Sequence, residues 1–181
     1  MALRIELLDG HAGRDSFDCG VAALNDFLSR HAGQQQRKGI GKTYVALADG
    51  GDVISGFVTV SVGQVAASEL PSDLKLPRYP VPILRIGRLA VDKRWQGQGV
   101  GHELLAFALH LALDFSERVG LYAVVVNARD DRGGGFYRKL GFRPTLDEAL
   151  CLFCCSQSCG KRGRESIPAI CPVRNEAFRI S

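Results

Sequence analysis

A glycine-rich segment between a predicted strand and a predicted helix constrains the fold of this chain more than any other feature. Residues 83–91 form an apolar run that predicts a strand, and residues 96–101 have the sequence Gln-Gly-Gln-Gly-Val-Gly. Apolar residues at helical spacing follow over 100–118, and the continuous apolar run 121–126 predicts a strand buried on both faces. Such a strand–helix–strand unit is expected to be parallel and right-handed.

The glycine-rich segment has the composition of an anion-binding turn. The first amide groups of a helix lack intrahelical acceptors and carry a partial positive charge, and glycines let the backbone approach a ligand closely. A phosphate group is therefore the expected ligand. A P-loop is excluded because no Gly-Lys-Ser/Thr is present, and a dinucleotide fingerprint is disfavoured because five residues separate Val91 from Gly97. A glycine-rich loop without a ligand is the remaining alternative.

The rest of the chain predicts a mixed α/β domain. Further elements follow from the same periodicities: strands at 3–7, 43–47 and 53–62, helices at 21–32 and 131–140, and a last hairpin within 142–153. Residues 34–39 predict either a short helix or a loop. Residues 49–52 (Asp-Gly-Gly-Asp) predict a hairpin turn, and four prolines between Ser68 and Pro82 predict an irregular loop. The apolar stripe of the helix after the glycines is predicted to be Val100, Leu104, Ala108, Leu111 and Phe115.

Composition and charge narrow the class of protein. The 181 residues carry a net charge of +4, and the segment from Lys161 onward holds five basic and two acidic residues, so nucleic-acid contact by the rest requires a local basic patch. No signal-peptide pattern or membrane-length apolar run is present, which predicts a cytoplasmic protein without membrane contact. Cys151-x-x-Cys154 resembles half of a zinc knuckle, but no second pair or nearby histidine completes it, so no metal site is expected. The apolar pattern ends after Phe153, which predicts a domain over 1–155 and a poorly structured Cys- and Arg-containing tail over 156–181.

The glycine turn and its preceding strand resemble the central motif of the GNAT superfamily of N-acetyltransferases. Arg88-Leu-Ala-Val91 followed by Gln96-x-x-Gly99-x-Gly101 matches the pattern Q/R-x-x-G-x-G/A after a strand. The resemblance implies a GNAT fold, which is a mixed, mostly antiparallel sheet with a central splayed parallel strand pair and flanking helices. It implies acetyl-CoA as the acetyl donor, with pantetheine against the backbone of Leu89, Ala90 and Val91. The pyrophosphate would bind the turn N–H groups of Gln96, Gly97, Gln98, Gly99, Val100 and Gly101.

A second segment, Phe136-Tyr-Arg-Lys-Leu-Gly-Phe142, resembles the superfamily pattern F-Y-x-x-x-G-F. Phe136 and Leu140 share a helix face, and Tyr137 is rotated by about 100° from Phe136, so the core is not expected to claim the tyrosine. The resemblance implies that Tyr137 is the general acid that protonates the leaving CoA thiolate. Phenol and thiol acidities are close enough for this transfer. A half-buried packing tyrosine is the structural alternative.

Three further features surround the tyrosine segment. Phe136 is expected beside the cofactor. Asn127, at the end of the preceding strand, is a candidate contact for pantetheine or for the amine. Gly133-Gly134-Gly135 stands where members of the superfamily tend to have Ala or Ser. It implies either a loose helix start, because glycine costs a helix interior about 1 kcal/mol relative to alanine, or an unusually close approach to the cofactor.

The acceptor side is indicated by a segment near the N-terminus. Residues 17–28, Phe-Asp-Cys-Gly-Val-Ala-Ala-Leu-Asn-Asp-Phe-Leu, resemble the F-x-C-G-x-x-x-L-D-x-F-L opening of the GNAT toxins of bacterial type II toxin–antitoxin pairs, with Asn25 where many of these have Asp. Residues 43–46 and 82–91 extend the match, which covers about 3–153. The resemblance implies acetyl transfer to the α-amino group of aminoacyl-tRNA, which blocks translation. It also implies a homodimer and a ribbon–helix–helix antitoxin that neutralises the enzyme and alone contacts operator DNA.

Basic residues after the first helix, and around the irregular loop and the cofactor strand, are the candidates for tRNA contact. They are Arg37, Lys38, Lys42, Arg78, Arg85, Arg88 and Arg94, with Lys75 and Lys93 nearby. Such contacts are salt-dependent and follow RNA shape, and a solvated charged face is the alternative. No general base is evident, and His31 and His102 are weak candidates. Two other functions stay open: an acetyltransferase for a protein N-terminus, polyamine or antibiotic, and a catalytically inactive co-repressor.

Overall fold

The computed structural model describes residues 3–10, 13–48 and 51–155, so the predicted tail over 156–181 lies outside the described residues and the boundary near 155 stays a prediction. The described residues build one seven-stranded sheet in the order β1-β2-β3-β4-β5-β7-β6. Neighbouring strands are antiparallel except β4 and β5, which pair in parallel. The strands are β1 (Leu3–Leu7), β2 (Lys42–Ala48), β3 (Ile54–Val65), β4 (Val81–Val91), β5 (Ala123–Asn127), β6 (Arg143–Pro144) and β7 (Cys151–Cys155).

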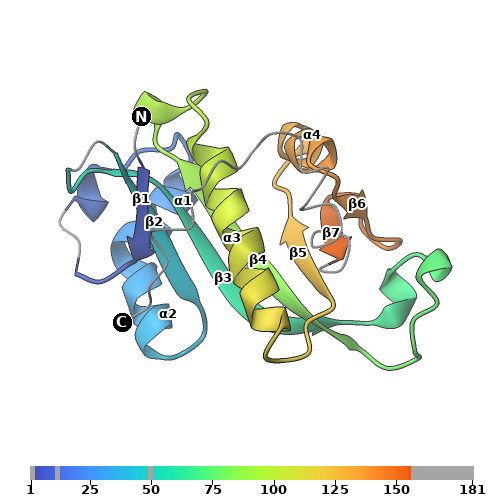
Figure 1. The fold of residues 1–181 in the computed structure, drawn as a ribbon. Helices are drawn as coiled ribbons and strands as arrows, with labels where there is room; N and C mark the ends of the chain where they lie inside the picture. The colour runs from blue at the N-terminus through green and yellow to red at the C-terminus, as the bar shows by residue number, and fades with distance from the viewer. Residues whose placement is uncertain (1–2, 11–12, 49–50, 156–181) are drawn as a thin grey trace.

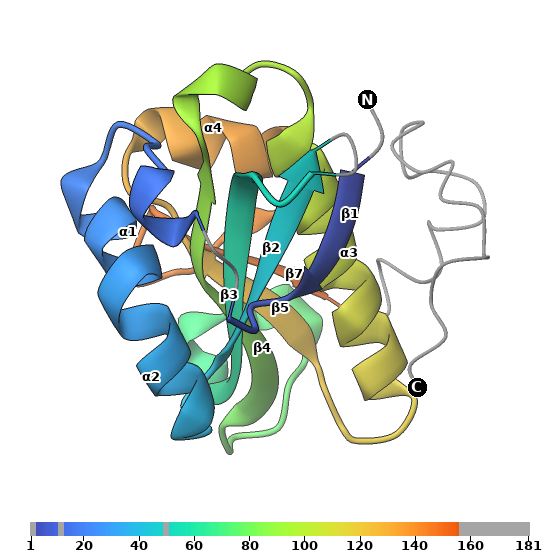
Figure 2. The same cartoon turned by 90° about the vertical axis from the view of Figure 1, so that its left-hand side faces the viewer.

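Helices cover both faces of this sheet. α3 lies along β3 and β4 on one face, and the helical stretch from α1 to α2 lies on the opposite face (Figures 1 and 2). The helices are α1 (Ala22–Asp26), the π-helix η2 (Phe27–His31), α2 (Ala32–Arg37), α3 (Val100–Ser116) and α4 (Asp131–Lys139). Short 3₁₀ turns are η1 (Arg14–Ser16), η3 (Ala67–Glu69), η4 (Ser72–Leu74) and η5 (Lys93–Trp95). None of the helices in the described part has an apolar stretch long enough to cross a lipid bilayer.

In the central strands, alternating side chains pack into hydrophobic cores on opposite faces of the sheet. In β3, Val58 points toward α3 and its neighbour Phe57 points toward η2, as the period of two in a strand requires. The Phe57 ring lies 5.4 Å from Phe17 and 6.1 Å from Phe27, measured between ring centroids. The segment that leads from β3 to β4 covers the same face further along, over β5 and β7. The predicted mixed, mostly antiparallel sheet with flanking helices is confirmed.

The buried stripe of α3 differs from the predicted one. Its buried residues are Val100, Leu104, Leu105, Ala108 and Ala112. The prediction is wrong at Phe115, which is exposed, and Leu111 is only partly buried. Nearly every residue between 104 and 113 is apolar, so periodicity alone does not select the inner face. α3 lies very close to β3 at Gly56, where an added Cβ would be 2.8 Å from Leu104 Cδ1 and 2.9 Å from the Ala90 carbonyl oxygen.

Several predicted boundaries also shift. The helix predicted over 21–32 continues to Arg37 with a π-turn in its middle, so residues 34–37 are helical. The apolar pattern stopped short of this end because α2 buries only Ala32. β3 continues past its predicted end to Val65, and β4 begins inside the predicted irregular loop, where Pro82 pairs with Gln64. The predicted last hairpin is confirmed as the antiparallel pair of β6 and β7.

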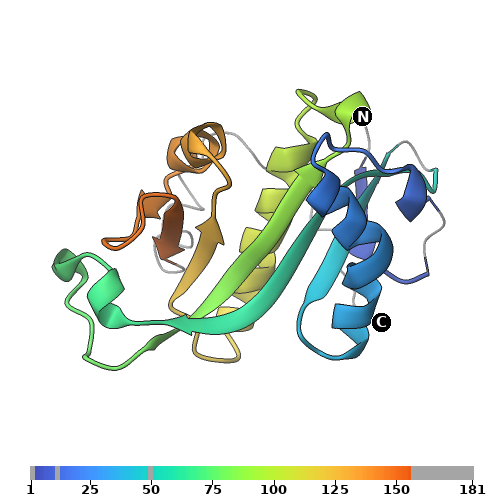
Figure 3. The ribbon, with the colours of Figure 1, turned by 180° about the vertical axis from the view of Figure 1, so that it is seen from behind.

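The parallel pair at the sheet centre opens along its length. β4 and β5 pair only from Ile83 with Ala123 to Ile86 with Val126. β4 continues to Val91, whereas β5 ends at Asn127. The two strands therefore part after Ile86, and Figure 3 shows β5 diverging from β4 toward α4. The predicted splayed pair is confirmed.

Candidate functional site

A cleft of about 990 Å³ opens where β4 and β5 part. Its floor includes Ile86 and Val126, the last pair before the strands separate. One wall is the glycine turn at 96–101 with the start of α3, here called the donor turn. The second is the acceptor wall, formed by Cys19, Val21 and Leu24 before and within α1, and the third is the start of α4.

The donor turn has the backbone that an anion site needs. Gly97 and Gly99 have φ angles of 78° and 89°, in the left-handed region that only glycine adopts without strain. Val100 and Gly101 are the first two residues of α3, so their N–H groups have no acceptor within the helix. Gly97, Gly99, Val100 and Gly101 all line the cleft. The Gln96 side chain instead donates to the backbone, to Val91 O at 2.9 Å and Cys19 O at 3.1 Å.

The exposed edge of β4 supplies a second kind of contact. Residues 88–91 pair with β3 on one side, and within the described part of the chain no strand lies beside them toward β5. An open strand edge presents backbone N–H and C=O groups to an extended ligand. The two amides of a pantetheine arm match such an edge, and its pyrophosphate matches the donor turn. Leu89, Ala90 and Val91, predicted for this contact, line the cleft.

A β-bulge shapes this part of β4. Thr59 pairs with Arg88 and Val60 pairs with Ile86, so Gly87 is the additional residue. The bulge places Arg85 and Arg88 on the same face of the sheet, away from α3. Arg88 lines the cleft, and its guanidinium carbon lies 3.8 Å from the centroid of the Phe27 ring.

Tyr137 lies at the junction of the cleft and the core. The prediction that the core does not claim it is wrong: Tyr137 is 7% exposed and buried on α4, whereas Phe136 is only partly buried. α4 turns its Gly134 and Tyr137 side inward, because the Phe142 ring beyond the helix packs against Tyr137 at 5.6 Å between centroids. Tyr137 nevertheless lines the cleft. Burial raises its pKa to about 12, so the phenol keeps its proton at neutral pH.

Asn127 and Phe136, which were predicted to contact the cofactor, both line the cleft. Arg85 Nη1 donates to Asn127 Oδ1 at 2.6 Å, which leaves the Nδ2 amide group of Asn127 as the donor for a ligand. The Phe136 ring packs edge-on against His102, with the centroids 4.9 Å apart. This contact places His102 at the cleft as a packing side chain.

The glycines at the start of α4 have different surroundings. Asp130 caps the helix by accepting from the Gly133 N–H at 2.9 Å, and Gly133 lines the cleft. A Cβ on Gly134 would be 3.3 Å from Arg138 Nη1 and from Leu150 Cδ2, while a Cβ on Gly135 would meet nothing within 4 Å. Close packing therefore accounts for Gly134, whereas the surroundings of Gly133 and Gly135 would accommodate a Cβ.

The predicted basic residues do not form one patch. Lys42 lies on β2, two strands away from the cleft: it pairs with Val60, which in turn pairs with Ile86 of β4. Arg37 and Lys38 lie near it, at the end of α2. Arg94 is bound to the Asp92 carboxylate through Nε at 2.8 Å and Nη2 at 2.9 Å. Arg78 lies in the loop between η4 and β4. Arg88 alone among the seven candidates lines the cleft.

Sequence reasoning missed several residues of the site. The lining of the cleft also includes Trp95, Ala128, Arg129, Asp130 and Arg132. The Asp92 carboxylate stabilises the segment before the turn by accepting from the Arg94 N–H. Asp92 is 1% exposed. A charged residue placed directly after a buried strand was a usable signal for it. The described residues contain no group of three or more His, Cys, Asp or Glu side chains able to hold a metal ion, while Cys159 and Cys171 lie outside them.

A family profile described as "Acetyltransferase (GNAT) domain" matches residues 39–144. The chain belongs to the GNAT acetyltransferase family. It is therefore an N-acetyltransferase, and the predicted family is confirmed. The profile includes β4, the donor turn and the Tyr137 segment, and ends before β7.

Characterised relatives make the resemblance more specific. The "tRNA-acetylating toxin" of Mycobacterium tuberculosis is 33% identical over 137 residues, which is 75% of this chain and 81% of the relative. The structure of AtaT complexed with acetyl-methionyl-tRNAfMet is 32% identical with a TM-score of 0.82, and the match covers 88% of this chain and 98% of that one. A Tyr-to-Phe mutant of the AtaT toxin, bound to the C-terminus of the antitoxin AtaR and acetyl-CoA, is 31% identical with a TM-score of 0.74 over 87% and 96% of the two chains. This protein is thus a homologue of GNAT toxins.

Proposed function

We propose that this protein acetylates the α-amino group of aminoacyl-tRNA with acetyl-CoA and thereby stops translation. The observation that carries the proposal is that an open strand edge, a glycine turn, Tyr137 and the Arg88 guanidinium line one cleft. The homology to a tRNA-acetylating toxin supports charged tRNA as the acceptor.

The donor side follows from backbone groups. The N–H groups of Gly97 to Gly101 would hold the pyrophosphate, and the β4 edge at 89–91 would pair with the pantetheine amides. Acetyl-CoA supplies an activated thioester. Asn127, at the end of β5, faces the same part of the cleft with its Nδ2 group, where it can hold an amide carbonyl or the incoming amine.

The chemical step needs an amine, an acid and no strong base. The α-amino nitrogen attacks the acetyl carbon, the C–N bond forms, and the C–S bond breaks. Tyr137 donates its proton to the leaving sulfur and regains one from solvent, while the new amide loses its extra proton to water. Asp130 is unsuited as a base: the Gly133 N–H and Arg129 bind its carboxylate and lower its pKa. An α-amine is already a weak base near neutral pH, so water suffices as the proton acceptor.

On the acceptor side, Arg88 is the candidate for the 3′ end of the tRNA. Its stacking on Phe27 fixes the guanidinium at the cleft before substrate arrives, which lowers the entropy lost on binding. Arg94 is less suited, because its guanidinium is already paired with Asp92. Arg37, Lys38 and Lys42 lie where a more distant part of a large substrate would reach. A small amine such as a polyamine would leave this cluster unused.

The biological context completes the proposal. A ribbon–helix–helix antitoxin would bind and silence the enzyme, and operator DNA would be contacted through the antitoxin. The enzyme would act in the cytoplasm, where charged tRNA is found, and as a homodimer.

The experiment is an acetylation assay with purified protein and labelled acetyl-CoA. Charged tRNA, the same tRNA after deacylation, spermidine, an aminoglycoside and a peptide with a free N-terminus serve as acceptors. We expect label only on charged tRNA, as N-acetyl-aminoacyl adenosine after nuclease digestion and mass spectrometry. Label on another acceptor but not on charged tRNA would refute the proposal. A protein that binds acetyl-CoA but labels none of the acceptors would favour a co-repressor.

A further inference from the structure

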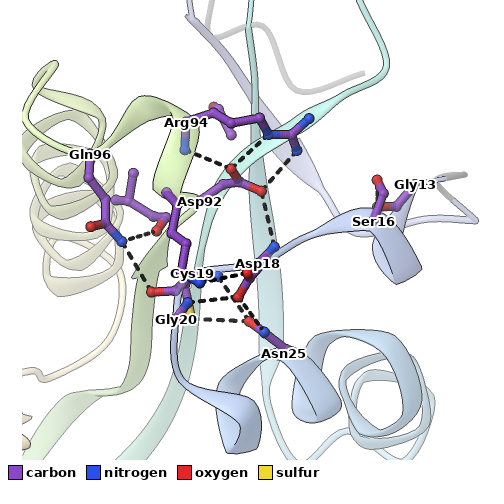
Figure 4. A network of polar contacts seen from close by, with 12 residues as sticks. Gly13, Ser16, Asp18, Cys19, Gly20, Asn25, Asp92, Arg94 and Gln96 are labelled. Atoms are coloured by element: carbon purple, nitrogen blue, oxygen red, sulfur yellow. Dashed lines mark hydrogen bonds and ion pairs between the residues drawn. The ribbon is translucent and has the colours of Figure 1, made fainter.

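Three segments far apart in the sequence meet beneath the cleft in one network of hydrogen bonds (Figure 4). They are the loop at 17–20 that leads into the acceptor wall, Asn25 on α1, and residues 91–96 beneath the donor turn. The Asp92 carboxylate accepts from the Asp18 N–H at 3.0 Å, and the Lys93 N–H donates to Asp18 O at 2.9 Å. Gln96 Nε2 donates to Cys19 O, so the donor turn is tied to a residue that itself lines the cleft.

The network divides into bonds within a wall and bonds between walls. Within the acceptor wall, Asn25 Oδ1 accepts from the Cys19 N–H at 3.0 Å, and Asn25 Nδ2 donates to Asp18 Oδ1 at 2.9 Å. Between the walls, the side chains of Asp92 and Gln96 make contacts across 74 and 77 positions of sequence, and Lys93 Nζ donates to Asp18 Oδ2 at 2.8 Å. The side chains of Asp92 and Gln96 are therefore placed to set the relative position of the two walls.

We infer that Gln96 and Asp92 are positioning residues that hold the acceptor wall against the donor turn, so that the acceptor amine is aligned with the acetyl group of acetyl-CoA. The inference rests on the proposed function, because it takes the acceptor wall to be the side of the cleft that receives aminoacyl-tRNA. Asp92 acts from a buried position, and Gln96 acts at the cleft itself. A shift of this wall by a fraction of an ångström moves the acceptor amine relative to Tyr137, and rates are sensitive to such displacements.

The network also gives a reason for an amide side chain at position 25. The loop carries Asp18, whose Oδ1 receives the Asn25 amide group at 2.9 Å. An amide can accept from the Cys19 N–H and donate to Asp18 at the same time, which a carboxylate cannot do. Asn25→Asp would lose the donor and would place a second carboxylate beside Asp18, whose Oδ2 is paired with Lys93 Nζ at 2.8 Å. The acceptor wall should therefore be looser in this variant.

The test measures coupling between Gln96 and Asn25 in the full-length enzyme. We expect Asn25→Ala to lower kcat/KM for charged tRNA about three- to tenfold, the usual worth of a hydrogen bond, without changing the Kd for acetyl-CoA. Gln96→Ala should lower the same kcat/KM, and Gln96→Glu should lower it further because a carboxylate faces two carbonyl oxygens. The double variant Asn25→Ala/Gln96→Ala should be much less impaired than the product of the single effects, because both hold Cys19.

Gln98 provides the matched comparison. Its Nε2 donates to Arg94 O at 2.8 Å, within the donor segment and not to the acceptor wall. The effects of Gln98→Ala and Asn25→Ala should therefore multiply. Amide hydrogen exchange of residues 17–24 should accelerate in Gln96→Ala and stay unchanged in Gln98→Ala. Multiplicative effects for Gln96 and Asn25, or unchanged exchange in Gln96→Ala, would overturn the inference. A wild type that leaves charged tRNA unlabelled refutes the proposed function instead, and hydrogen exchange then decides the inference alone.

Discussion

The donor turn and the acceptor wall face each other across one cleft but are built in different ways. The donor side is continuous in sequence, from the β4 edge through the turn into α3, and it offers mainly backbone groups. The acceptor side offers side chains, and contacts to residues more than 70 positions away fix its place. A backbone site tolerates sequence change as long as the glycines remain, whereas a side-chain site can be retuned by single substitutions. This difference is consistent with a common acetyl donor and with acceptors that differ between members of one superfamily.

Tyr137, at the junction of the two sides, carries the largest expected effect. Tyr137→Phe keeps the ring and its packing against Phe142 but removes the proton donor. We expect kcat to fall about 100- to 10,000-fold, the range typical of general acid catalysis, with the acetyl-CoA Kd unchanged. Stopped assays of charged-tRNA acetylation, together with calorimetry of acetyl-CoA binding, measure the two quantities. An unchanged kcat would remove Tyr137 from the chemistry.

Gly99 tests the donor side alone. Gly99→Val puts a β-branched residue at a φ of 89° and should raise the Kd for acetyl-CoA about tenfold or more, since left-handed backbone costs a non-glycine residue about 1–2 kcal/mol. Gly39 is the matched control: its φ is 71°, an added Cβ meets nothing within 4 Å, and it is absent from the cleft lining. Gly39→Val should lose comparable stability and bind acetyl-CoA normally. Equal effects of both variants on binding would mean that strain, and not the turn, is being measured.

Arg88 tests the acceptor side alone. Arg88→Gln should raise the KM for charged tRNA about tenfold and should reduce the slope of log affinity against log salt by about one, as loss of one phosphate contact predicts. The acetyl-CoA Kd should stay constant. Titrations between low and physiological salt measure the slope. An unchanged slope with a raised KM would assign Arg88 to packing on Phe27 and not to phosphate.

The glycines of α4 give a smaller effect on stability. Gly135→Ala should raise the free energy of unfolding by about 1 kcal/mol, because the position is helical and the added methyl group meets nothing within 4 Å. Gly134→Ala should gain less, because its methyl group would crowd Arg138 and Leu150. Urea unfolding of the two variants compares them directly. A destabilised Gly135→Ala would show that the helix start must stay loose.

The smallest expected effect is a pH dependence of the free energy of unfolding that comes from Asp92. Burial alone would raise the pKa of Asp92, but hydrogen bonds from Arg94 and from the Asp18 N–H outweigh it and lower the pKa. The resulting stability is present above about pH 4, the usual range of a free carboxyl, and is lost as pH falls through the lower folded-state pKa. Asp92→Asn should therefore unfold more easily at pH 6 and show a shallower loss below pH 4. Unfolding curves at several pH values measure this slope, and parallel slopes would contradict it.

The donor side could be predicted from the sequence almost completely, because its determinants are local. Glycines at alternate positions between a strand and a helix specify the turn, and the burial of residues 123–126 follows from their apolar run. The inward orientation of Tyr137 could not be predicted, since it depends on Phe142 packing from beyond the helix. The link from Gln96 to Cys19 was also out of reach, because no local pattern reports a contact across 77 positions.

The parting of β4 and β5 also links the binding of acetyl-CoA to the stability of the fold. A ligand that lies along an open strand edge and pairs with its backbone does for the sheet what another strand would do, so it adds to the stability of the folded protein by mass action. At 100 times its Kd, acetyl-CoA would contribute about 2.7 kcal/mol. The enzyme would then resist unfolding and proteolysis best at a high concentration of acetyl-CoA and would unfold more easily as that concentration falls.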